Sequence, residues 1–246
     1  MKQKGKLKRI VIFCLCVIGI TAATVLAVSK NSEEEVKNTF TYGEVKITLS
    51  EEKYDQLSNA AKVMAPLSKI DKDPVVVNTG KNDAVVFIKV EIPKALVDTV
   101  GDVDDGHGGV TPNQKIHNTE KVQLFNLITT VDGNDENKVN DNWKLVSKDQ
   151  KGSDVNTYVY GYTKVIAKNE KTKALFDKIQ LINILETDSL SGSVGNINVY
   201  AYAIQADNIL INNQKVTDEQ LAHSVAGGSE TVYDNLVDIY DKYVNP

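Results

Sequence analysis

The chain has 246 residues, with 28 Lys and Arg side chains against 33 Asp and Glu, a net charge of −5 and two cysteines. The phosphate backbone of a nucleic acid repels a chain with this balance, so nucleic acid is excluded as an expected partner. Both cysteines, Cys14 and Cys16, lie in an N-terminal apolar run. The rest of the sequence therefore offers neither a thiol nucleophile nor a disulfide.

The N-terminus has the pattern of a secretory signal peptide. Lysines and Arg9 precede an uncharged run of 19 residues, Ile10–Val28, which contains the small-residue pattern Val25-Leu26-Ala27. This pattern predicts cleavage by a signal peptidase between Ala27 and Val28, and therefore a secreted protein. The alternative is an uncleaved anchor, because a run of this length can just span a bilayer. That leader would be the only part of the protein in contact with a membrane.

Cleavage would make the mature chain strongly acidic. Five of the 28 basic residues leave with the leader, so 23 basic residues face 33 acidic ones and the net charge becomes −10. We expect residues 28–37, which are polar and acidic, to be flexible. Residues 38–246 form the expected folded domain, which is long enough to bury a sizeable core without disulfides.

Alternating apolar residues predict a series of β-strands. The first carries Val45, Ile47 and Leu49 on one face, and Ser50 after it is expected to cap a short helix. Further strands are expected over residues 75–77, 84–92, 122–130, 143–146, 158–163, 180–185 and 199–206. Pro93 is expected to end the strand over residues 84–92, whose apolar face is continuous.

Segments without this alternation separate the strands. Residues 98–118, rich in Gly and Asp, are predicted to be a loop, and residues 132–141 a polar turn. Near the C-terminus, Thr217 and Gln220 fit a capping box. A second helix is expected after Ser229, with an apolar stripe formed by Val232, Leu236, Ile239 and Tyr243. These elements predict an all-β fold, an antiparallel β-sandwich with short flanking helices.

One segment has the composition of a weak cation site. Four carboxylates and a histidine crowd the predicted loop; they are Asp98, Asp102, Asp104, Asp105 and His107. Alternating carboxylates can chelate a hard cation such as Ca²⁺, although no Glu at the EF-hand spacing completes the pattern. A solvated loop is the competing interpretation. Asp132, Asn134 and Glu136 repeat the arrangement more weakly.

Patterns of catalytic chemistry are missing from the sequence. The three histidines, His107, His117 and His223, show no H-E-x-x-H spacing, and no G-x-S-x-G or phosphate-binding glycine motif occurs. The sequence therefore predicts no enzyme activity. Two rows of alternating tyrosines, over residues 158–162 and 200–202, could stack on carbohydrate or, alternatively, pack against cross-strand neighbours.

Several short strings occur in a characteristic order along the chain. They are Asn38-Thr39-Phe40-Thr41, Lys72-Asp73-Pro74, Val77-Asn78-Thr79-Gly80, Asn142-Trp143, Tyr160-Gly161-Tyr162, Leu175-Phe176-Asp177 and Ala201-Tyr202-Ala203-Ile204-Gln205-Ala206. In this order, and up to about residue 207, the chain resembles the camelysin and TasA family of secreted proteins, whose leaders are processed by a SipW-type signal peptidase. It departs from the family at Met64-Ala65-Pro66-Leu67, where a Pro-Gly turn is often found.

The resemblance implies a jelly-roll β-sandwich and a structural role in the extracellular biofilm matrix or at the cell surface. In fibre-forming members an N-terminal segment of one subunit adds as a strand to the next, so the partner would be a second copy or another matrix protein. Here that assembly strand would include Phe40, Val45, Ile47 and Leu49. Two alternatives stay open: a secreted metal-dependent protease, as the camelysin name suggests, and a surface adhesin that does not polymerise.

Overall fold

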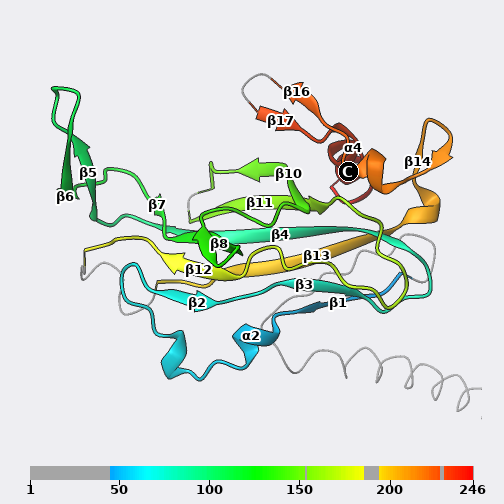
Figure 1. Ribbon diagram of the computed structural model, residues 1–246, viewed down its shortest axis with the longest axis horizontal. Coiled ribbons are helices and arrows are strands. Elements are labelled where there is room, and N and C mark those ends of the chain that lie inside the picture. Colours follow the sequence, from blue (N-terminus) through cyan, green and yellow to red (C-terminus); the bar gives the residue numbers. More distant parts are fainter. Residues whose placement is uncertain (1–44, 153, 186–193, 228–229, 246) are drawn as a thin grey trace, which may run out of the picture. The chain divides into compact units, whose positions relative to one another are not determined.

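The computed structural model describes residues 45–152, 154–185, 194–227 and 230–245 (Figure 1). The predicted leader, the cleavage point between Ala27 and Val28, residues 28–37 and Phe40 lie outside this part of the chain. Within it, no helix has both the length and the apolar character needed to cross a membrane.

The described chain is all-β and is built mainly from antiparallel strands. The larger sheet has the order β10-β11-β4-β13, and β7 pairs with the end of β4. Its strands are β4 (Ala84–Ala95), β7 (Val122–Gln123), β10 (Trp143–Asp149), β11 (Val155–Tyr162) and β13 (Asn198–Gln205). The second sheet has the order β2-β12-β8-β9. Its strands are β2 (Lys69–Asp71), β8 (Phe125–Val131), β9 (Asn134–Glu136) and β12 (Lys178–Leu181).

Shorter elements complete the fold. The two-stranded pairs are β1 (Ile47–Ser50) with β3 (Val75–Asn78), β5 (Thr99–Asp104) with β6 (Val110–Ile116), β14 (Leu210–Ile211) with β15 (Gln214–Lys215), and β16 (Val225–Gly227) with β17 (Glu230–Val232). The α-helices are α2 (Glu52–Asp55), α3 (Asp218–Leu221) and α4 (Asp234–Tyr243), and 3₁₀ turns occur at η1 (Ala60–Lys62) and η3 (Ala206–Asn208).

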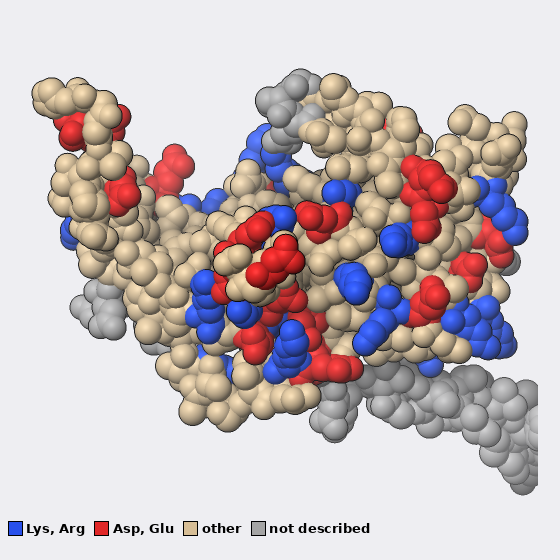
Figure 2. Space-filling model, viewed as in Figure 1, with Lys and Arg blue, Asp and Glu red and all other residues tan. Residues whose placement is uncertain are grey.

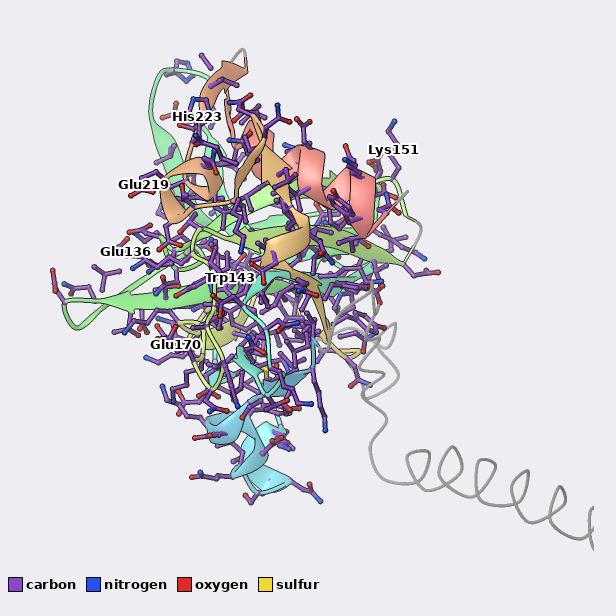
Figure 3. The ribbon with its side chains drawn as sticks, turned by 90° about the vertical axis from the view of Figure 1, so that its right-hand side faces the viewer. Glu136, Trp143, Lys151, Glu170, Glu219 and His223 are labelled. Carbon is purple, nitrogen blue, oxygen red and sulfur yellow. The ribbon has the colours of Figure 1, made fainter. Side chains whose placement is uncertain are left out.

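The first hydrophobic cluster lies between the two large sheets. β4 contributes Val86, Ile88, Val90 and Ile92, each at most 1% exposed, and β8 and β12 contribute apolar residues from the opposite sheet. Trp143 lies in the same interior, 2% exposed, and its indole N–H donates to the Lys173 carbonyl at 3.0 Å (Figure 3). The alternation predicted for residues 84–92 is therefore the inner face of a central strand.

The second hydrophobic cluster covers part of the outer face of β4. Val85 and Phe87 are fully buried there, under C-terminal residues that include Leu236, Ile239 and Tyr240 of α4. The ring centroids of Phe87 and Tyr240 lie 5.6 Å apart. β4 is therefore buried on both faces over its first five residues, whereas alternation alone predicts one buried face.

Pro93 does not end β4, contrary to the prediction. The strand continues to Ala95 because the ladder on one side stops earlier: β13 begins at Asn198, opposite Glu91. Proline has no N–H to donate, and none is needed at Pro93 because β13 does not pair with this part of β4. The Pro93 carbonyl accepts the Leu124 N–H at 2.9 Å.

The predicted loop over residues 98–118 is wrong, since these residues contain the β5–β6 hairpin. Its strands are paired through the backbone and exposed, so they need no apolar alternation. The polar turn over residues 132–141 is in part a hairpin turn. Asp132 and Gly133 both have positive φ, 49° and 84°, and join β8 to β9.

Two predicted helix starts are also wrong. Ser50 ends β1, and the one-turn helix α2 is preceded by Glu51, which makes no side-chain cap. Ser229 lies outside the described residues, and α4 begins only at Asp234, after the β16–β17 hairpin. The capping box at α3 is confirmed: Thr217 Oγ1 accepts the Gln220 N–H, and Gln220 Oε1 accepts the Thr217 N–H.

Candidate functional site

The structure places most of the predicted assembly strand in the chain's own core. Val45 and Ile47 are 5% and 4% exposed and belong to the cluster between the sheets, and Leu49 packs against it. Ile47 pairs with Asn78 of β3. Phe40 lies outside the described residues, so its role stays a prediction.

β1 lies between two other strands. It pairs with β3 along its length and also contacts β13 of the larger sheet. The opposite edge of β3 is taken by the segment over residues 169–172: the Thr172 N–H donates to the Val76 carbonyl, and the Asn78 N–H to the Glu170 carbonyl, both at 2.9 Å. β1 therefore fills a slot between β3 and β13.

The turn after β3 is held by the buried amide of Asn78. Asn78 Nδ2 donates to the carbonyls of Asn82 and Ile166, at 2.8 and 2.9 Å, and Asn78 Oδ1 accepts the Gly80 N–H at 3.0 Å. The amide nitrogen and the amide oxygen of Asn78 both have hydrogen-bond partners. These bonds fix the end of β3, which forms one side of the slot. The sequence string Val77-Asn78-Thr79-Gly80 does not reveal these partners.

A buried ion pair anchors the end of β1. Lys72 Nζ lies 2.6 Å from Glu51 Oε2, and these side chains are 5% and 2% exposed. Lys72 Nζ also lies 4.3 Å from the centre of the Tyr54 ring, and Asp73 Oδ1 accepts the Lys53 N–H at 2.9 Å. The Lys72-Asp73 string thus joins β2 to the chain that follows β1, a role that the sequence pattern did not assign.

The carboxylates proposed for a cation are distributed along the β5–β6 hairpin. Asp98 at its base pairs with Lys115 and His117, each at 2.7 Å. Near the tip, Asp104 Oδ1 accepts the Gly106 N–H, and Asp105 Oδ1 accepts two further backbone N–H groups. In the described ranges, no three His, Cys, Asp or Glu side chains are grouped to hold a metal ion.

Hydrogen bonds at the hairpin favour the ionised carboxylates. Those from Lys115 and His117 lower the pKa of Asp98, and backbone N–H groups of His107 and Gly109 lower the pKa of Asp105. Negative charge is therefore retained at this hairpin over a wide pH range. The third histidine, His223, pairs with Asp234 at α4, on a different element.

The two tyrosine rows lie on opposite faces of the larger sheet. Tyr160 and Tyr162 face the core between the sheets, where Tyr162 lies 4.8 Å from the Trp143 ring. Tyr200 and Tyr202 pair with Lys89 and Phe87, on the outer face. The rows therefore form no continuous aromatic surface, and cross-strand packing explains the inner row.

A polar cluster occupies the outer face of β4 beyond Phe87. Lys89 Nζ lies 2.8 Å from Glu91 Oε1 and 4.3 Å from the centre of the Tyr200 ring. Partial burial alone would raise the pKa of Glu91, but hydrogen bonds from Lys89, Asn198 and Tyr200 outweigh it and lower that pKa. This cluster was missed because alternation marks such positions only as solvent-facing.

Among these arrangements, the slot that holds β1 has the clearest structural role. The hairpin carboxylates instead accept hydrogen bonds from backbone N–H groups in the turn or form ion pairs. A comparison with protein-family models, curated proteins and solved structures finds no match for the chain.

Proposed function

We propose that the protein is a secreted structural subunit of the extracellular matrix or cell surface, with a jelly-roll-like β-sandwich body, and that it assembles into fibres through its N-terminal strand. The predicted leader and the family resemblance of the short strings support secretion and a matrix role. The two sheets that share one core support the sandwich.

One observation carries the assembly proposal: β1, four residues long, fills a slot between β3 and β13 close to the predicted mature N-terminus. A second copy has the same slot and the same strand. Exchange of an identical element between copies replaces each contact by an equivalent one, so it costs little free energy. An extended strand satisfies the N–H and C=O groups of a receiving edge in the same way.

In this proposal, β1 of one subunit occupies the slot of the next, and residues 51–68, between β1 and β2, link it to its own subunit. Residues 28–44, which precede β1, would add further backbone contacts on the neighbour. Val45, Ile47 and Leu49 then fill the same pockets in the neighbour as in their own chain. A shift by one residue would turn these side chains to the wrong face, so the register should be unique.

Electron microscopy of the purified mature protein, beginning at Val28, tests this function. Fibres without casein cleavage by the same sample are expected. Chelator-sensitive cleavage that is lost on His107→Ala or His117→Ala would favour the metal-dependent protease instead. A monomer that binds cells or glycans without forming fibres would favour the adhesin.

A further inference from the structure

The β5–β6 hairpin, here called the arm (residues 99–116), is a two-stranded sheet, and no other described part of the chain packs on most of it. Every residue from Asp102 to Lys115 is exposed. The arm projects from one end of β4 in Figure 1. An isolated two-stranded hairpin is only marginally stable in water, so an arm of this length gains stability from a surface that covers it.

The base of the arm is fixed to the rest of the chain. The Val100 N–H donates to the Asn183 carbonyl at 2.8 Å, and the Leu185 N–H donates to the Asp98 carbonyl at 3.0 Å. Thr99 also forms a bridge with Ile184. The arm is therefore presented in a defined direction, as a docking element requires.

The distal part of the arm is acidic and carries exposed apolar side chains. Asp102, Asp104 and Asp105 make no ion pair with any residue in the described part of the chain; their carboxylates accept hydrogen bonds from backbone N–H groups. Val103 and Val110 beside them are 39% and 65% exposed. Three carboxylates around two valines suit a basic, partly apolar partner surface.

A basic surface lies at the other end of β4. In an acidic chain, the lysine segment (residues 164–173) carries four exposed lysines and one Glu. The lysines are Lys164, Lys168, Lys171 and Lys173. Glu170, labelled in Figure 3, accepts the Ala167 N–H of its own turn at 3.2 Å. None of the four lysines has an ion-pair partner among the residues described.

The lysine segment is as firmly fixed as the arm. Ile166 and Ala84 exchange two backbone hydrogen bonds, at 2.8 and 2.9 Å, and Lys171 bridges Val77 of β3. Ala84 begins β4 and Ala95 ends it before the arm, so the twelve-residue strand separates the two surfaces by about 40 Å. Figure 2 shows acidic side chains on the projecting hairpin, and both lysines and acidic side chains at the opposite end of the body.

We propose that the arm of one copy docks on the lysine segment of the next copy, with Asp102, Asp104 and Asp105 facing Lys164, Lys168 and Lys171. The proposal rests on the assembly function above and adds a second contact to it. Because the two surfaces differ and lie at opposite ends of β4, the contact is head-to-tail, which gives an open filament when the rotation does not close. Complementary charge fixes which end meets which.

A charge-swap experiment on the mature protein tests this contact. The arm variant is Asp102→Lys with Asp104→Lys and Asp105→Asn, and the segment variant is Lys164→Glu with Lys168→Glu and Lys171→Glu. Each alone places like charges at the contact and should raise the critical concentration for assembly about ten-fold or more. An equimolar mixture of the two should restore it, because each arm then meets an oppositely charged segment on the other variant.

Matched controls separate a specific contact from a general charge effect. Lys53→Glu with Lys151→Glu and Lys242→Glu makes the same change in net charge as the segment variant, and should alter the critical concentration by less than about three-fold. Circular dichroism of each variant confirms that it is folded. The arm variant with all three aspartates changed to Asn keeps the turn acceptors and should show a smaller defect than the charge reversal.

Cross-linking decides the outcome independently of fibre formation. A mixture of ¹⁴N- and ¹⁵N-labelled mature protein, treated with a carbodiimide, should give mixed-isotope links between the three arm aspartates and the segment lysines. Fibres without such links, and without a response to either charge reversal, would overturn this proposal and leave the assembly function standing. Mixed-isotope links in a sample that forms only short oligomers would support the contact and contradict fibre formation.

Discussion

The two faces of β4 are built from the same twelve residues but depend on different parts of the chain. The inner face is apolar from Val86 to Ile92 and is covered by the second large sheet. The outer face is apolar only at Val85 and Phe87, where C-terminal residues cover it, and becomes polar at Lys89 and Glu91. The inner cluster therefore includes the elements that define the fold, whereas the outer cluster attaches the C-terminal elements to it.

This difference leads us to expect two levels of cooperativity. Loss of an inner contact removes support from both sheets at once, and β1 shares that inner cluster through Val45 and Ile47. Loss of an outer contact should first release α4 and its neighbours. Sub-global opening of this kind is common where one structural unit packs on another.

The largest effect is expected from Ile47→Asp in the inner cluster. Ile47 is 4% exposed, so the change removes an apolar side chain and buries a carboxylate, which should cost about 5 kcal/mol or more. Urea titrations followed by circular dichroism should show that the variant is an unfolded monomer. Thr48→Asp, at an exposed position on the same strand, is the control. A stable Ile47→Asp monomer would show that β1 is not part of the chain's own core.

Phe87→Ala in the outer cluster should cost about 3–5 kcal/mol of unfolding free energy where α4 packs. Hydrogen exchange followed by mass spectrometry should show faster exchange in residues 206–245, with smaller changes in β8 and β12. Equal loss of protection in all these elements would show instead that the two clusters unfold as one unit.

Gly161→Ala probes how closely α4 approaches the sheet. A Cβ at Gly161 would lie 2.9 Å from Leu236 Cδ2 and 3.0 Å from Phe87 Cε1, closer than atoms in contact. Overpacking of this kind costs about 1–3 kcal/mol. Combining it with Leu236→Ala should remove part of the penalty in a double-mutant cycle. Strictly additive penalties would show that the methyl group does not meet α4.

The smallest effect is expected at the polar end of the outer face, where Glu91 has a lowered pKa. A carboxyl group whose pKa is lower in the folded state than in the unfolded state stabilises the protein at pH values above the unfolded-state pKa, which is about 4. This contribution is lost as the pH falls through the folded-state pKa. Glu91→Gln should therefore be less stable than the unchanged protein at pH 7, by less than about 1 kcal/mol for a partly solvated pair. In urea titrations the difference should shrink at pH 3; a difference that grows on acidification would contradict this assignment.

The sequence predicts elements that have a one-sided apolar pattern and misses those that do not. The inner row of β4 and the capping box at Thr217 are found at the expected positions. The arm escapes prediction because its strands are held by backbone hydrogen bonds and exposed on both faces. The outer cluster escapes because Val85 and Phe87 stand at positions that alternation assigns to solvent, and only the tertiary fold brings α4 over them.

The candidate site shows the same limit. Val45, Ile47 and Leu49 were predicted as an apolar strand, and they form one, but sequence alternation cannot tell whether a strand belongs to its own chain or to a neighbour. The slot between β3 and β13 depends on pairs distant in sequence, such as the Asn78 amide with the Ile166 carbonyl. The buried Lys72–Glu51 pair likewise joins residues whose relation is visible only in the folded chain.

Deletion of residues 28–39 from the mature protein tests the assembly account most directly. The deletion leaves Val45, Ile47 and the rest of β1 in place, so the truncated protein should fold. Without the backbone contacts that residues 28–39 would add on a neighbour, β1 should stay in the slot of its own chain. A matched control replaces these residues by a scrambled segment of the same composition and length. Negative-stain electron microscopy and sedimentation should show fibres for the mature and scrambled proteins and monomers for the truncated one. A folded truncated protein that still forms fibres of normal length would contradict assembly through the N-terminal strand.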